Sequence, residues 1–226
     1  RLRDNRAVSE ASEFVPLYIF DHRWLENELV SDHRVEFIME ALKDLNSRYN
    51  DRGSHLVLRH GDTIEILEEL EDKFERIIFL RDRNHFRQEQ EEALRKRYTD
   101  IAGSPATMDI QRPQFRSEIE EYFSSKPHQP SKTVRPSIES DTTISEIMED
   151  YSIDSRKEDF GEGGRTEAIR RFEDFADRIG SYAGCISSPS KAEANTSHLS
   201  PYIRYGCVSA REVYQYVDER CGGRSA

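Results

Sequence analysis

A hydroxyl-rich turn near the carboxyl end of the sequence carries the residue types that bind phosphate. Thr196, Ser197 and Ser200 supply hydroxyls, and Pro201 stands where a helix can begin, a position that proline favours. Backbone N–H groups at the start of a helix are a common phosphate site. The pattern therefore predicts a phosphate-binding turn. Because Thr and Ser also cap helices widely, a plain capping loop is a second interpretation, and the two are compatible.

Other motifs give weaker signals for chemistry. Residues 161–166 read Gly-Glu-Gly-Gly-Arg-Thr, but they lack the Gly-Lys-Ser or Gly-Lys-Thr ending of a phosphate loop and do not follow a predicted strand. The seven histidines form no His-Glu-x-x-His motif, so we expect no metal site. The three cysteines include no Cys-x-x-Cys pair and indicate neither a disulfide framework nor a structural zinc site.

The elements that must position these residues begin with alternating strands and helices. Short apolar runs predict strands at residues 15–20, 55–59, 76–80 and 106–110. Apolar residues at three- and four-residue spacing predict helices from 32 to before 53 and from 64 to 74, and residues 86–98 are predicted as a strongly charged helix. Asp32 is the expected N-cap of the first of these helices. The alternation predicts an α/β fold, a Rossmann-like parallel sheet covered by helices.

The second half of the chain has a different pattern. Residues 124–162 contain several prolines and no sustained periodicity, and we interpret them as an interdomain linker. Beyond them, residues 166–179 and 209–220 have helical spacing, and Ser209 is the expected cap of the second helix. The predicted organisation is an α/β domain over residues 1–123, the linker, and the start of an all-α domain over residues 163–226.

Two segments of the chain resemble one protein family. The order of Tyr182, Pro189, the run 196–202 and the run 206–211 resembles the flavin-diphosphate segment of the photolyase/cryptochrome family. Residues 1–8, Arg-Leu-Arg-Asp-Asn-Arg-Ala-Val, resemble the amino-terminal signature of that family, which in relatives follows a first strand. The resemblance implies a fragment that lacks this strand and most of a helical FAD-binding domain.

The resemblance implies FAD as the cofactor and assigns contacts with it to six residues. Their hydroxyls and backbone amides would donate to the flavin phosphates. These residues are Tyr182, Thr196, Ser197, His198, Leu199 and Ser200. Asn84 and His85 fall where relatives have a loop facing an antenna chromophore, of folate or deazaflavin type, although a polar loop before a helix explains them as well.

The function that the resemblance implies is light-driven repair of cyclobutane pyrimidine dimers in UV-damaged DNA by electron transfer from reduced FAD. The damaged bases are flipped into the flavin pocket, which costs least for bases that are already unpaired. A cryptochrome-type blue-light photoreceptor and a truncated, non-catalytic remnant are the alternatives. In relatives, later segments complete the site, so we expect this fragment alone to bind FAD weakly and to repair nothing.

The composition limits the partners of the chain. Its net charge is −11, with 7 Lys and 26 Arg, and an acidic chain is a poor general binder of nucleic acid, so any contact with DNA must be local. No stretch approaches 18 consecutive apolar residues and no charged-then-apolar leader opens the chain. We therefore expect a cytoplasmic protein without a membrane segment. Trp24 lies in the first predicted domain and is expected to be a packing residue.

Overall fold

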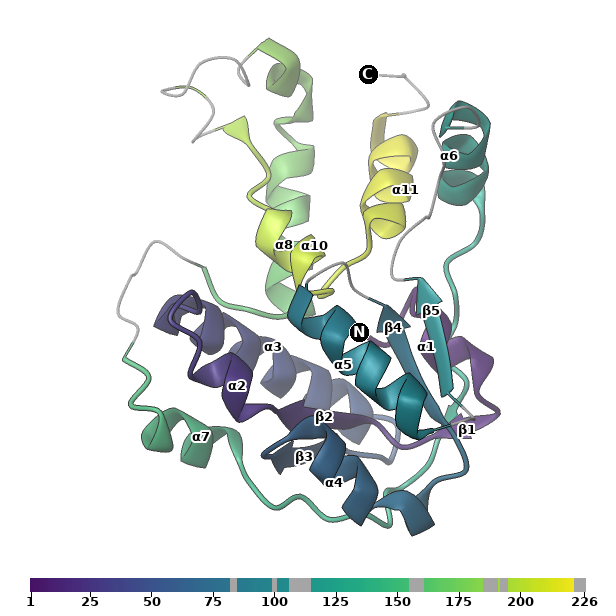
Figure 1. The fold of residues 1–226 in the computed structure, drawn as a ribbon. Coiled ribbons are helices and arrows are strands. Elements are labelled where there is room, and N and C mark those ends of the chain that lie inside the picture. Colours follow the sequence, from purple (N-terminus) through teal and green to yellow (C-terminus); the bar gives the residue numbers. More distant parts are fainter. Residues whose placement is uncertain are drawn as a thin grey trace.

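The structure, a computed structural model, describes residues 1–81, 85–98, 101–105, 115–154, 161–184, 191 and 195–221. Strands and helices alternate in its first part, and helices make up its last part (Figure 1). The strands are β1 (Glu13–Phe14), β2 (Leu17–Phe20), β3 (Val57–His60), β4 (Ile77–Arg81), β5 (Ile101–Pro105) and β6 (Lys132–Thr133). The α-helices are α1 (Arg6–Glu10), α2 (His22–Leu25), α3 (Asp32–Asn50), α4 (Thr63–Glu69), α5 (His85–Arg97), α6 (Phe115–Ser124), α7 (Ile144–Asp150), α8 (Arg165–Ala176), α10 (Ser200–Arg204) and α11 (Ala210–Cys221), and the 3-10 helices are η1 (Glu71–Lys73) and η3 (Ile179–Gly184).

The strand pairs of the described residues are all parallel. β2 pairs with β3, β4 pairs with β5, and β1 pairs with β6, with Leu17 opposite Val57 and Ile77 opposite Ile101. Parallel neighbours need crossover connections, and these contain α3 between β2 and β3 and α5 between β4 and β5. The predicted α/β class with parallel strands is confirmed. Within the described residues, however, the strands form three separate two-stranded pairs.

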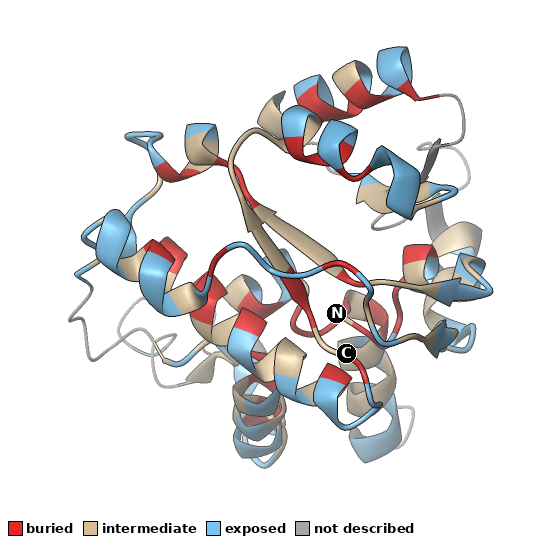
Figure 2. Cartoon of the chain, turned by 90° about the horizontal axis from the view of Figure 1, so that it is seen from below, coloured by how far each residue is buried: buried red, intermediate tan, exposed pale blue. Residues whose placement is uncertain are grey.

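Helix α3 organises the core. Val35 and Met39 are 1% and 0% exposed and belong to the main core cluster, in which Trp24 packs as the sequence predicted. Phe37 belongs to a second cluster, where its ring meets Tyr202 of α10 edge-on at 5.0 Å between centroids. In Figure 2 the helices carry buried residues on one side and exposed residues on the other. One helix thus joins the α/β part of the chain to the carboxyl-terminal helices.

Most predicted elements are present, and several predicted boundaries are wrong. The residue at the N-cap position of α3 is Ser31, which has an extended backbone, whereas Asp32 is already helical. α4 ends at Glu69, because the chain tightens there into the 3-10 helix η1, so Leu70 lies beyond the α-helix. The predicted strand at 106–110 lies outside the described residues. β4 pairs instead with β5, which comes just before the predicted strand in the sequence.

The segment predicted as a linker contains regular structure. Its strand β6 pairs with β1, and α7 begins with a capping box. In that box Thr143 Oγ1 accepts a bond from the Glu146 amide at 3.2 Å, and the Thr143 amide donates to the Glu146 carboxylate at 2.7 Å. Ile147 is 0% exposed in the main core. The segment therefore packs on the α/β part, and the division of the chain into two domains stays a prediction.

None of the helices in the described ranges combines the length and the apolar character that crossing a bilayer requires. The same ranges hold no cluster of three or more His, Cys, Asp or Glu side chains placed to bind a metal ion.

Candidate functional site

The predicted phosphate-binding turn leads directly into α10. Pro201 occupies the first turn of this helix, as predicted. The N-cap residue of α10 is Leu199, which makes no side-chain capping bond. Ser197 Oγ accepts a hydrogen bond from the Leu199 amide at 3.4 Å, and Thr196 Oγ1 lies 3.2 Å from His198 Nε2. Ser197 thus bonds the backbone just before α10, and a capping loop and a phosphate-binding turn both stay open as interpretations.

The turn has exposed polar side chains next to a buried leucine, Leu199. His198 has a φ of 51°, in the left-handed region that residues with a side chain rarely adopt. Such outliers cluster at functional sites, where the surrounding structure maintains them. His198 and Ser200 are exposed, whereas Leu199 is 3% exposed and packs in the second core cluster with Tyr202. Leu199 is therefore held in the apolar cluster, while His198 and Ser200 on either side of it face outward.

Tyr202 holds the turn to the segment before α8. Its hydroxyl donates to the carbonyl of Glu162 at 2.7 Å. Burial raises the pKa of Tyr202 to about 12, with partial opposition from the nearby guanidinium of Arg171. The phenol is therefore protonated at neutral pH and remains a hydrogen-bond donor.

Tyr182 lies in η3, after α8. Its side chain is 41% exposed, and its ring meets that of Phe175 edge-on at 5.7 Å between centroids. Pro189 and Asn84 lie outside the described residues, and His85 is the first residue of α5. The assignment of Tyr182 and the turn to one flavin site stays a prediction.

The backbone amides at the end of the glycine-rich segment 161–166 are bound by a carboxylate of the chain itself. Asp44 of α3 accepts hydrogen bonds from the backbone amides of Arg165 at 3.1 Å and Thr166 at 3.3 Å. Burial disfavours the charge of Asp44, but hydrogen bonds from Arg48 and Thr166 outweigh it, so the pKa of this carboxyl lies below its usual value. The amides that a phosphate would need are already bound, which agrees with the rejection of a phosphate loop here.

A buried carboxylate closes the carboxyl end of β2. Asp21 is 2% exposed and accepts hydrogen bonds from Arg23 Nη2, Thr63 Oγ1 and Gln90 Nε2, each at 2.8 Å. Burial opposes ionisation of Asp21, but the bonds from Arg23 and Thr63 outweigh it and hold its pKa well below the usual range. Open parallel sheets often bind ligands at this end of their strands. Here the charge is neutralised by the side chains of the chain itself.

A cavity of about 690 Å³ lies between α3, the first three residues and the end of α10. Aromatic side chains in its lining include Tyr18, Trp24 and Phe86, and arginines include Arg52 and Arg204. Of the described residues that line this cavity, none is a predicted flavin contact. The sequence motifs gave no signal for it, because its lining comes from segments far apart in the chain.

Comparison with known proteins decides the family. A family model described as DNA photolyase matches residues 1–113, half of the chain. The chain belongs to the DNA photolyase family. Cryptochrome DASH of Xenopus laevis is 24% identical over all of this chain and 52% of its own length. Deoxyribodipyrimidine photo-lyase of Synechococcus sp. is 24% identical over 95% of this chain and 51% of its own length.

A solved structure supports the photolyase fold. The archaeal photolyase from Sulfolobus tokodaii, solved with two FAD molecules, superposes with a TM-score of 0.72 at 20% identity and covers 97% of this chain. The present chain covers 54% of that structure. This chain spans about half the length of the photolyase and cryptochrome relatives that it matches.

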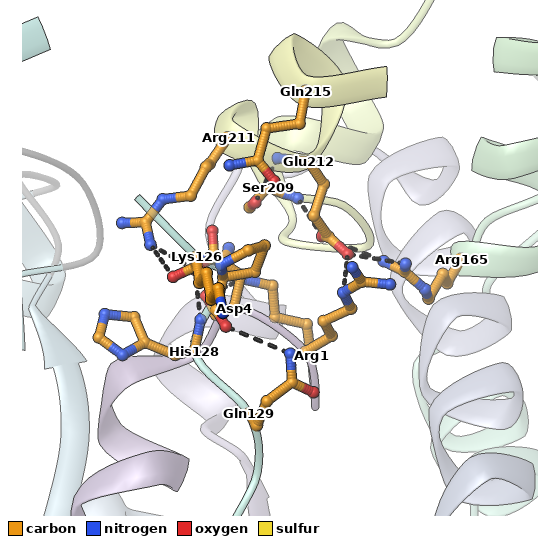
Figure 3. Close-up of polar contacts among 12 residues, drawn as sticks. Arg1, Asp4, Lys126, His128, Gln129, Arg165, Ser209, Arg211, Glu212 and Gln215 are labelled. Carbon is orange, nitrogen blue, oxygen red and sulfur yellow. Dashed lines mark hydrogen bonds and ion pairs between the residues drawn. The ribbon is translucent and has the colours of Figure 1, made fainter. Parts of the chain in front are cut away.

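The two motifs that resemble the photolyase family meet in one buried polar cluster (Figure 3). Asp4, from the amino-terminal motif, is 3% exposed, and Arg211, from the motif after the turn, is 5% exposed. Arg211 Nη1 lies 3.4 Å from Asp4 Oδ1 and donates to the Lys126 carbonyl at 2.9 Å. The Arg211 guanidinium also lies 4.1 Å from the centroid of the Tyr122 ring. Sequence reasoning placed both residues in motifs but missed that they touch.

Glu212 forms the other half of this cluster (Figure 3). Its carboxylate accepts bonds from Arg165 at 2.7 and 3.1 Å and from the Ser209 amide at 2.9 Å, and it lies 3.4 Å from Arg3 Nε. Ser209 Oγ accepts a bond from the Glu212 amide at 3.0 Å, so Ser209 caps α11 as predicted. The first turns of α8 and α11 are thereby tied to each other and to the amino-terminal segment.

Proposed function

We propose that this chain is part of a light-dependent DNA repair flavoprotein that splits cyclobutane pyrimidine dimers in UV-damaged DNA. The observation that carries the proposal is the turn at 196–200, which places three hydroxyl side chains and a left-handed residue, His198, at the start of α10. It does so in a chain of the DNA photolyase family. The whole activity belongs to the full-length protein, of which this chain spans about half.

The chemistry of the donor set fits a flavin diphosphate. Thr196 and Ser197 carry hydroxyls that can donate to phosphate oxygens, and α10 begins without a side-chain cap. Tyr182 offers a further, half-exposed hydroxyl. When bound, FAD supplies the electron for dimer cleavage under light. The residues of this chain bind the phosphates and orient the cofactor, while apolar packing of Leu199 keeps the donors in place.

The test compares flavin content in the full-length protein. The double variant Thr196→Ala/Ser197→Ala removes both hydroxyls, including the one that accepts the Leu199 amide bond, and leaves the apolar packing of Leu199 in place. We expect FAD affinity to fall by about tenfold or more, because a hydrogen bond to a charged group contributes roughly 1.5–3 kcal/mol. Ser31→Ala is the matched control, since Ser31 makes no side-chain capping bond in α3. Absorbance spectra during FAD titration give the affinities.

An unchanged flavin affinity in the double variant contradicts the assignment of the turn. The chain of 226 residues is measured in parallel, and we expect weak FAD binding and no repair from it alone. A flavin spectrum at stoichiometric loading of this chain contradicts that expectation. If the full-length protein, with its carboxyl-terminal part present, also shows no flavin spectrum, the result favours a non-catalytic remnant.

A cryptochrome-type photoreceptor is the second candidate. Cryptochrome DASH of Xenopus laevis matches this chain at the same 24% identity as the Synechococcus photo-lyase, so similarity does not separate repair from signalling. Dimer repair under blue light, measured on the full-length protein with an oligonucleotide containing one thymine dimer, distinguishes them. Loss of the dimer only in the light supports repair, and an intact dimer with a light-dependent change of conformation supports the photoreceptor.

A further inference from the structure

Asp4 is buried in a conformation that few residues adopt. Its φ is 51°, in the left-handed region, where Asp is tolerated better than most residues with a side chain. The Asp4 amide donates to the His128 carbonyl at 2.8 Å, and the His128 amide donates to Asp4 Oδ1 at 3.1 Å. The Asp4 carbonyl accepts a bond from Arg1 Nε at 2.9 Å. The neighbouring backbone therefore holds Asp4 in place from several directions.

The ion pair between Asp4 and Arg211 is incompletely hydrogen-bonded. Asp4 Oδ2 and Arg211 Nε are both buried without a hydrogen-bond partner, and the pair itself is separated by 3.4 Å. A buried pair with unsatisfied atoms pays much of its desolvation cost without recovering it. General stability is thus a poor explanation for burying these two charges. Buried ionic groups can instead specify one arrangement of neighbouring elements, a role that must be tested for each protein.

A continuous set of backbone bonds runs from this cluster back to the turn. Cys207 and Val208, just before Ser209, donate to the Tyr202 carbonyl at 2.8 and 3.4 Å. Tyr205 donates to the Pro201 carbonyl at 2.9 Å. Ile203 donates to the Leu199 carbonyl at 3.0 Å, which reaches the last residue before α10. These bonds connect the segment just before Arg211 with Leu199, the residue that leads into α10.

We propose that Asp4 and Arg211 are positioning residues, which fix the turn at 196–200 relative to the α/β part of the chain. Apolar packing around Leu199 and Phe37 is non-directional and allows sliding, whereas the Asp4–Arg211 pair, with Lys126 as a third partner, admits one register. The adjacent residue Glu212 reinforces the same register through its bonds with Arg165 of α8. The significance of this register for flavin binding rests on the proposed function.

The test uses neutral substitutions of the pair. Asp4→Asn keeps the left-handed conformation accessible and removes the charge, and Arg211→Gln removes its partner. We expect either single variant to lower the midpoint of unfolding, because it leaves one buried charge unpaired. The double variant Asp4→Asn/Arg211→Gln leaves no unpaired charge, so its midpoint should return close to that of the wild type. Arg6→Gln is the control, since it breaks the exposed Arg6–Glu10 pair.

Hydrogen exchange of individual amides separates positioning from general stability. In the double variant we expect the hydrogen-bonded amides of Ile203, Tyr205 and Cys207 to exchange about tenfold faster than in the wild type, with the amides of α3 unchanged. In the full-length protein we expect the double variant to bind FAD about tenfold more weakly, although its unfolding midpoint is restored.

The outcomes are distinct. Unchanged exchange at these three amides in the double variant overturns the proposal, as does an equal acceleration throughout α3, which indicates a general role in stability. A wild-type full-length protein that binds no FAD refutes the proposed function. The exchange result still decides whether Asp4 and Arg211 position the turn, because it needs no flavin.

Discussion

Substitution of Gly163 tests how closely the segment before α8 packs on α3. A Cβ atom at this position would lie 2.0 Å from the carbonyl oxygen of Phe37, 3.0 Å from its carbonyl carbon and 3.1 Å from the amide nitrogen of Ala41. All three are backbone atoms of a long, buried helix, so no side-chain rotation relieves the overlap. Gly163→Ala must therefore separate the two segments or distort α3.

The size of the effect follows from this geometry. Overpacking in a well-packed interior costs about 1–3 kcal/mol, and a contact with fixed backbone belongs at the upper end of that range, about 3 kcal/mol. For a chain of this size 1 kcal/mol corresponds to about 2–4 °C, so the midpoint of thermal unfolding should fall by about 6–12 °C. The separation also weakens the bonds that the first amides of α8 donate to the Asp44 carboxylate.

Gly180→Ala is the matched control. Gly180 is exposed in η3, and a Cβ there meets nothing within 4 Å. Its substitution should leave stability within about 1 kcal/mol of the wild type, or raise it slightly by restricting the unfolded chain. Thermal unfolding of both variants is followed by circular dichroism. Equal midpoints for Gly163→Ala and Gly180→Ala would refute the close approach of the segment to Phe37.

Three further perturbations test other contacts. Ser209→Ala removes the cap of α11 and should lower the free energy of unfolding by about 1 kcal/mol in a urea titration. Asp21 stabilises the fold above its unfolded pKa of about 4, and this contribution is lost as the pH falls through its lowered folded value; Asp21→Asn should therefore flatten the fall of the thermal midpoint between about pH 5 and pH 2. Tyr214→Ala removes the ring stacked on Phe123 at 4.7 Å and should cost about 1 kcal/mol in the same titration. If Ser209→Ala or Tyr214→Ala costs no measurable stability in the urea titration, the corresponding contact is contradicted. If the thermal midpoints of the wild type and Asp21→Asn fall in parallel with pH, the role of the Asp21 bonds is contradicted.

Local patterns predicted the elements that have strong periodicity. The helices α3, α8 and α11 and the strands β2, β3 and β4 all appear near their predicted positions, because each has an apolar face or run that must be buried. α5 also lies near its predicted position, although its buried residues are Gln90, Glu91 and Leu94. β5 was missed since its sequence, Ile-Ala-Gly-Ser-Pro, consists mainly of residues typical of turns. Its strand conformation comes from pairing with β4, a tertiary contact.

The segment 124–162 shows what periodicity alone overlooks. Its prolines and polar residues suggested a linker without structure, yet α7 starts at a Thr143–Glu146 capping box that is visible in the sequence. The helix has only seven residues, too few for an apolar stripe to stand out, but it buries Ile147 completely. A search for capping pairs before short apolar runs would have found it.

The candidate site was predictable only where its residues are close together in the sequence. The turn and Pro201 at the start of α10 follow from neighbouring residue types. The contact between Asp4 and Arg211 joins residues at opposite ends of the chain, and neither residue type indicates its partner. Long-range ion pairs depend on the packing of the elements that carry them, so they emerge only from the folded structure.

The contact between the two motifs changes what the family resemblance means. Residues 1–8 and 206–211 made the chain recognisable, and the structure shows that they are the two sides of one buried cluster. Their side chains bind each other and the backbone, so they are explained by the packing of helices on the α/β part. Such residues are needed equally by a repair enzyme and by a photoreceptor of the same fold. The choice between these functions must therefore depend on residues that contact the flavin and the DNA, which is why light-dependent repair, measured on the full-length protein, is the decisive experiment.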